Sequence, residues 1–99
     1  LSIHALINIL TDEEWQVRKP AAQALAAIGP DSQPAIPSLI EALNDEEWHV
    51  RKPAVEALAA IAPEDPDVLA ALRASLNDPE DQVRRAAARA LEVIEALTP

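Results

Sequence analysis

The stretch Asp12–Pro20, with the sequence DEEWQVRKP, decides the fold because it returns as Asp45–Pro53, a period of 33 residues. The two copies differ only in having Gln16 or His49 at the fifth position. A looser third copy occupies Asp78–Ala86. A fixed period of this length indicates one supersecondary unit stacked on itself. We therefore expect a repeat protein, and stacked repeats usually build surfaces rather than reaction centres.

The composition suits a single helical domain. Hydrophobic residues make up 49% of the 99 residues, the only aromatic residues are two Trp, and there is one Gly. A core built from Ala, Leu, Ile and Val favours closely packed helices, since Ala is the best helix former. The chain has no Cys, which excludes a disulfide framework, a thiolate metal site and a cysteine nucleophile.

The net charge of −9 restricts the classes of partner. Nucleic-acid binding needs a surplus of Lys and Arg to release counterions, so we predict no nucleic-acid partner. The charge fits solubility, or a neutral or basic protein partner. The sequence has neither an apolar run long enough to span a bilayer nor a signal-peptide pattern, which predicts a cytoplasmic protein without a membrane partner.

Prolines and polar clusters divide the chain into six predicted helices. They form three hairpins, each with a shorter helix A followed by a longer helix B, and no segment has the alternation of a strand. The predicted fold class is all-α, a right-handed α-solenoid of three helical hairpins. Its repeats are expected at residues 1–30, 31–63 and 64–99. Asp12 and Asp45 are expected to cap the first two B helices, and Asp65 to cap the fifth helix.

Apolar residues recur in register and define the predicted core. In the B helices the inward residues are Val17, Ala21, Ala24, Leu25 and Ile28, then Val50, Ala54, Ala57, Leu58 and Ile61, then Val83, Ala87, Ala90, Leu91 and Ile94. In the fifth helix we expect Val68 or Leu69, Leu72 and Leu76. Pro20 and Pro53 lie inside helix B, where proline removes a backbone hydrogen bond, so we expect kinks or a short irregular first turn there.

One pattern occurs three times, at Asp12–Ile28, Asp45–Ile61 and Asp78–Ile94: Asp-x-x-x-x-Val-Arg-x-x-Ala-x-x-Ala-Leu-x-x-Ile. With the preceding segment Pro34–Leu43, it resembles the short HEAT-like repeats of the phycobilisome-lyase type. That resemblance covers nearly the whole chain. It implies a hydrogen-bonded ladder between neighbouring units, with residues Asp12, Arg18, Asp45, Arg51, Asp78 and Arg84. Pro20 and Pro53 depart from the family pattern, and Ala86 takes their place in the third copy.

A helical wheel of helix B separates a core face from an outward face. In HEAT-like solenoids the B helices line the concave face, which is the usual binding surface. The resemblance therefore makes this outward face the candidate partner-binding surface. Its residues are Trp15, Gln16, Lys19, Gln23, Trp48, His49, Lys52, Glu56, Gln82, Arg85 and Arg89. Trp15 and Trp48 have two interpretations: an aromatic pair that anchors a partner, or indoles that cover a neighbouring hairpin.

Residues for catalysis or metal binding are missing. His4 and His49 have no second His four residues away, and neither begins the His-Glu pair by which some HEAT-like hydroxylases bind iron. The acidic runs at the starts of the B helices suit caps and helix dipoles, and no calcium-loop pattern accompanies them. We predict no enzyme activity, no cofactor and no metal site.

The leading functional prediction is a non-catalytic protein-interaction scaffold. Two alternatives stay open: a regulatory or lyase-type protein acting on a bilin or phycobiliprotein, and an engineered or consensus-like scaffold without a natural ligand. Leu1 and Ile9 add apolar surface to the first helix. This predicts end-to-end self-association through the N-terminal helix, and it is compatible with the chain being the C-terminal part of a longer solenoid.

Overall fold

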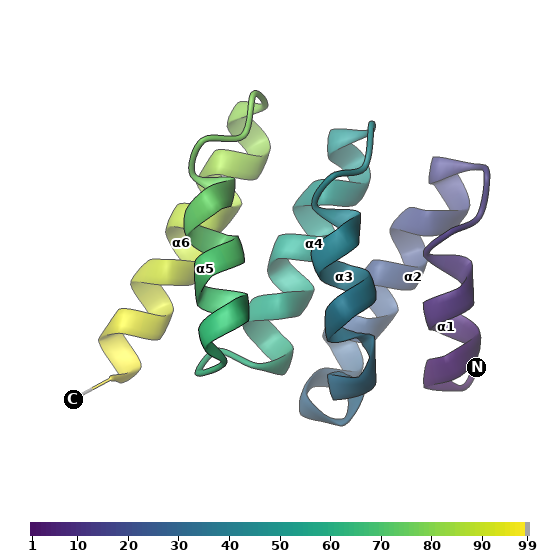
Figure 1. The fold of residues 1–99 in the computed structure, drawn as a ribbon, viewed down its shortest axis with the longest axis horizontal. Coiled ribbons are helices and arrows are strands. Elements are labelled where there is room, and N and C mark those ends of the chain that lie inside the picture. The colour runs from purple at the N-terminus through teal and green to yellow at the C-terminus, as the bar shows by residue number, and fades with distance from the viewer. Residues whose placement is uncertain (99) are drawn as a thin grey trace.

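The computed structural model describes residues 1–98, in which helices follow one another as hairpins in two layers (Figure 1). Helices α1, α3 and α5 form one layer, and α2, α4 and α6 lie behind them. No strand occurs in these residues, so the predicted all-α solenoid is confirmed. The elements are α1 (Ile3–Ile9), α2 (Trp15–Ile28), the 3-10 helix η1 (Gly29–Ala35), α3 (Ile36–Ala42), α4 (Trp48–Ile61), α5 (Pro66–Ser75) and α6 (Asp81–Leu97).

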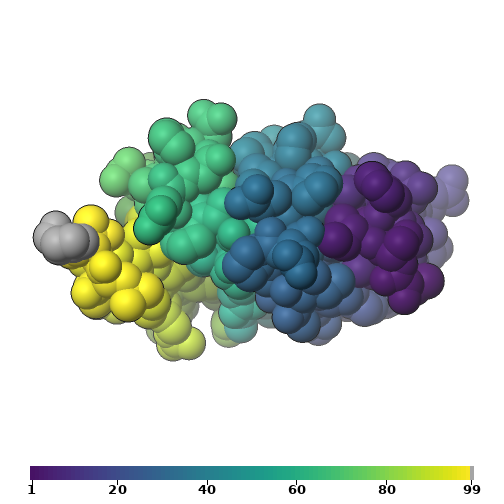
Figure 2. All heavy atoms as spheres, turned by 90° about the horizontal axis from the view of Figure 1, so that it is seen from below, coloured from purple at the N-terminus to yellow at the C-terminus, as the bar shows by residue number. Residues whose placement is uncertain are grey.

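The hairpins are stacked in chain order along the longest dimension of a body measuring 38 × 29 × 18 Å. Figure 2 shows this order as an uninterrupted progression from the purple N-terminal end to the yellow C-terminal end. The first and last hairpins therefore form the two ends of the stack. Pro99, the final residue of the predicted third repeat, lies outside the described residues.

The core is densest in the central hairpin, as a one-dimensional stack requires. The five predicted inward residues of α4, from Val50 to Ile61, are all buried. In the outer hairpins the prediction was partly wrong, because Val17, Ile28 and Leu76 are 41%, 40% and 39% exposed. These three side chains belong to hairpins that have a neighbour on one side only.

The B helices begin later than the sequence predicted. Asp12 and Asp45 do not cap α2 and α4. The N-cap residues are Glu14 and Glu47, whose side chains make no cap hydrogen bond. Instead, each Asp side chain accepts a hydrogen bond from the backbone N–H two residues on, at 2.9 Å. The acidic residues thus form the turn before each helix. Asp65, by contrast, caps α5 as predicted, accepting from two backbone N–H groups.

The prolines inside the B helices do not interrupt them. Helices α2 and α4 continue as single α-helices through Pro20 and Pro53. Pro34 belongs to η1, and α3 begins two residues later, at Ile36.

A tight turn joins the first two hairpins. Gly29 ends α2 with a φ of 75°, a conformation that side chains with a Cβ rarely adopt. The fully buried Ser32 hydroxyl then donates a hydrogen bond to the Leu25 carbonyl at 3.1 Å. The same carbonyl accepts the Gly29 backbone N–H, so the Ser32 bond is a second contact that holds the turn against the end of α2.

Candidate protein-binding surface

Arginine and aspartate side chains join each hairpin to the next. Arg18 Nε donates to Asp45 Oδ2 at 2.7 Å, and its Nη2 donates to Asp45 Oδ1 at 3.0 Å. One repeat later, Arg51 makes the same two bonds to Asp78, at 2.9 and 3.1 Å. Such forked pairs fix distance and orientation together. We call these two pairs the rungs.

Each rung arginine also braces the turn of its own hairpin. Arg18 Nη1 donates to the Asp12 carbonyl at 2.7 Å, and Arg51 Nη1 donates to the Asp45 carbonyl at 2.7 Å. The hydrogen bond to Asp45 is the main reason why the pKa of Arg18 is raised above its ordinary value. The rung side chains are therefore already bonded and hold the stack in register. Asp12 and Arg84, the other two residues of the expected ladder, lie at the two ends.

An aromatic stack connects the first two B helices. The His49 ring lies 4.4 Å from that of Trp15 and 3.9 Å from that of Trp48, centroid to centroid, with interplanar angles of 21° and 26°. The three rings form one cluster, in which His49 contacts both indoles. Both Trp side chains are half-buried and also pack against the core. The indoles thus cover the hairpin junction, while part of each remains accessible.

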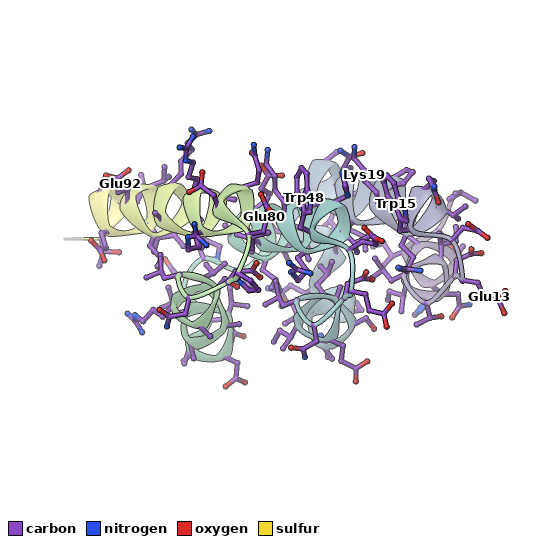
Figure 3. All side chains as sticks on the ribbon, turned by 90° about the horizontal axis from the view of Figure 1, so that it is seen from above. Glu13, Trp15, Lys19, Trp48, Glu80 and Glu92 are labelled. Atoms are coloured by element: carbon purple, nitrogen blue, oxygen red, sulfur yellow. The ribbon has the colours of Figure 1, made fainter. Side chains whose placement is uncertain are left out.

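The tryptophans and Lys19 lie along the side of the B helices that faces away from α1, α3 and α5 (Figure 3). A hollow of about 200 Å³ lies on this side between α2 and α4, and a longer groove of about 340 Å³ lies between α4 and α6. Lys52 and Glu56 line both, so the two hollows share a wall. Of the predicted surface residues, all but Trp15 and Gln16 line one of them. We call this surface the B face.

The B face carries cations although the chain as a whole is acidic. Within residues 1–98, no ion pair involves Lys19, Lys52 or Arg89. Arg85 is paired with Asp81 at 2.9 Å but is 74% exposed. The net charge of −9 therefore does not describe this surface, and most acidic residues lie elsewhere, many of them in the turns that precede the B helices.

Sequence reasoning missed the floor of the groove between α4 and α6. Ala59, Ala86 and Ala90 form it together with Val93 and Ile94. Small side chains leave room between the two helices, and Val93 is 54% exposed at the edge. The sequence analysis had assigned Ala90 and Ile94 to the core, although the alanine-rich third repeat was a signal for open space between the helices.

A larger hollow of about 470 Å³ lies on the other side of the stack, between α3 and α5. Its polar residues include Arg51, Asp45 and Asp78, which the rungs already engage. Within residues 1–98, no group of His, Asp or Glu side chains is arranged to hold a metal ion. The same part of the chain has no helix with the length and apolar character needed to cross a membrane.

Comparison with known proteins identifies the class. The family of HEAT repeats matches residues 3–92, and the chain belongs to this family. No curated protein sequence matches it. Among solved structures, human deoxyhypusine hydroxylase in complex with glycerol is similar, with 34% identity over 95% of this chain and a TM-score of 0.82.

Two engineered proteins are similar as well, at 29% and 27% identity over 90% of this chain, with TM-scores of 0.72 and 0.70. The chain spans 32% of the hydroxylase and 43% and 26% of the two engineered proteins. The shared feature is thus the stacked helical hairpin.

Proposed function

We propose that this HEAT-repeat chain is a non-catalytic scaffold that binds another protein on the B face. The observation that carries the proposal is the set of unpaired cations, Lys19, Lys52 and Arg89, beside two hollows and an exposed aromatic edge. Trp and Arg are the residue types most enriched at binding hot spots. The position of the cations favours a partner segment with acidic groups, rather than the neutral or basic partner that net charge alone suggested.

The packing of the helices supports the B face as the inner side of the stack. Helix α4 packs extensively on both α2 and α6, whereas α3 and α5 make few contacts with each other. Helices that approach more closely in one layer than in the other curve the stack toward the tighter layer. The tighter packing of the B layer therefore supports a concave surface for the proposed partner.

Two alternatives keep a place beside this proposal. Similarity to two engineered proteins supports a designed or consensus-like scaffold without a natural ligand. A role in bilin chemistry rests only on the resemblance of the repeat pattern, and an absorbing chromophore in the purified protein would favour it. The proposal includes a cytoplasmic location, and end-to-end self-association is compatible with it because the ends are separate from the B face.

The test compares proteins captured from cell extract by the wild-type chain and by matched variants. Lys52→Glu combined with Arg89→Glu reverses the charge of the groove, and Trp15→Ala combined with Trp48→Ala removes the aromatic stack. The control is Arg73→Glu on α5, an exposed residue that lies off the B face. Circular dichroism and thermal unfolding establish that each variant is folded before capture.

We expect the wild type and the Arg73 variant to capture one protein in equal amounts. The groove variant should capture at least about tenfold less of it, because charges at the interface have been reversed. Equal capture by all variants would refute the proposal. For the aromatic pair, lower unfolding stability with unchanged capture would assign both tryptophans to packing alone.

A further inference from the structure

The two ends of the stack each carry one half of a missing rung. Inside the stack, Arg18 and Arg51 side chains are 15% and 13% exposed because each is engaged by the Asp of the next hairpin. Arg84 stands at the same place in the last hairpin, and its side chain is 41% exposed. Asp12 stands at the equivalent place in the first hairpin and is exposed, whereas Asp45 and Asp78 are largely covered.

Both half-rungs are held in the geometry of the complete ones. Asp12 Oδ1 accepts from the Glu14 N–H at 2.9 Å, just as Asp45 and Asp78 accept from the residues two positions on. Arg84 Nη1 donates to the Asp78 carbonyl at 2.8 Å, as the rung arginines do in their own turns. Arg84 Nη1 also donates to the Pro79 carbonyl at 2.9 Å, and Arg84 Nη2 makes only a long contact, 3.4 Å, with the exposed Asp81. Binding would therefore require little ordering of either side chain.

Apolar residues surround each half-rung in the same register. At the N-terminal end, Val17 and Ile28 are about 40% exposed, while their equivalents in α4, which packs on α2, are almost fully buried. A hollow of about 420 Å³ lies here, lined by Leu1, Ile9, Val17, Pro20 and Ala24 among others. At the C-terminal end, the exposed Ala88 corresponds to Ala22 and Val55, which are fully buried, and Leu76 to the buried Leu10.

We propose that a second copy of this chain stacks end to end on the first, with Arg84 of one copy bound by Asp12 of the next. The α5–α6 hairpin of one copy then covers the N-terminal hollow of the other, and the junction repeats the contact that α2 makes with α4. The two faces differ, so the association is head-to-tail and extends beyond a dimer into a continued solenoid.

The polar replacements in the last hairpin are compatible with this junction. Glu92 occupies the position of Ala26 and Ala59 in the other two hairpins. Arg73 occupies the position of Ile7 and Ile40. Those equivalents are only half-buried inside the stack, so the replacing charges keep access to water at the rim. Figure 3 shows Glu92 on the outer edge of α6, away from the layer of α1, α3 and α5. The replacements weaken the junction relative to an internal one, which makes the association reversible and concentration-dependent.

The test uses sedimentation equilibrium of two half-blocked variants. Arg84→Glu blocks the C-terminal face and leaves the N-terminal face intact. Asp12→Ser blocks the N-terminal face, and its hydroxyl can still accept from the Glu14 N–H. Each variant alone should associate at least ~30-fold more weakly than the wild type, the loss expected when one partner of a buried pair is removed. Arg85→Glu, the same charge change one residue away, should associate like the wild type.

An equimolar mixture of the two variants is the decisive measurement, because it contains one junction with both Asp12 and Arg84. The mixture should form a one-to-one dimer and stop there, at a concentration where each variant alone is a monomer. This dimer also shows that both variants are folded. A wild type that stays monomeric up to millimolar concentration would overturn the proposal. In that case only a hairpin other than α5–α6 could cover the N-terminal face. Undiminished association of Arg84→Glu would also overturn it, in favour of two N-terminal faces meeting each other.

Discussion

The first prediction compares one substitution at two equivalent positions, Val50→Ala and Val17→Ala. The two valines occupy the same place in nearly identical sequences, but Val50 is fully buried and Val17 is 41% exposed. Any change in helix propensity is the same at both sites and cancels in the comparison. The difference in unfolding free energy therefore reports only what the stack places around each side chain.

The magnitudes follow from burial. Val→Ala removes two methyl groups, about 1.6 kcal/mol at ~0.8 kcal/mol per buried carbon. At Val50 an enclosed cavity adds to this, giving about 2–3 kcal/mol. At Val17 the lost contacts face an open hollow, so the cost is about 0.5–1 kcal/mol. The two melting temperatures should differ by about 10 °C in a chain of this size.

Urea unfolding followed by circular dichroism measures both variants, with the protein kept dilute so that copies do not associate. Equal destabilisation would refute the argument, because it would mean that Val17 is as enclosed as Val50. Repeating the comparison at high protein concentration connects it to end-to-end stacking. Covering the N-terminal face should then raise the cost of the Val17 substitution.

Four further substitutions test the joints between hairpins and the end of the stack. Arg51→Met should lower the unfolding free energy by about 3 kcal/mol, because it leaves the covered Asp78 carboxylate without its partner. Arg84→Met, at the exposed end of the stack, should lower it by under ~1 kcal/mol. Paired urea titrations measure the difference. Ser32→Ala should cost about 0.5–1.5 kcal/mol in thermal unfolding, since one hydrogen bond is lost while the Gly29 N–H still donates to the Leu25 carbonyl. Gly29→Ala should lower the unfolding free energy by ~1–2 kcal/mol because of the positive φ at this position. No steric clash contributes, since an added Cβ would meet no atom within 4 Å. Calorimetry that shows no destabilisation would contradict this.

Much of the fold could be predicted because its information is local and repeated. The period of the apolar residues defines helices, and the recurrence of the pattern aligns the hairpins, so the buried column from Val50 to Ile61 followed directly. The helix starts were wrong for a physical reason. An Asp followed by two Glu resembles a cap inside a first turn, but the Asp side chain bonds the N–H two residues on and delays the helix.

The candidate site was only half visible in the sequence. Outward-facing residues of the B helices could be named from the wheel, because a helix fixes direction. The grouping of Trp15, His49 and Trp48 could not, since it depends on the distance between two helices that are 33 residues apart in sequence. The alanine floor of the groove between α4 and α6 has the same origin.

By itself, the sequence determined that this chain is a stack of helical hairpins, because each repeat carries the pattern of one unit and each unit has an apolar face that only a neighbour can cover. Tertiary structure alone decided which of the equivalent residues are covered. Val17 and Val50 have nearly the same sequence context, and Arg84 and Arg51 occupy the same place in the repeat, yet each pair differs in having a hairpin beside it. Burial and ion pairing depend on neighbours in space, and a repeated sequence cannot show where the stack of neighbours stops.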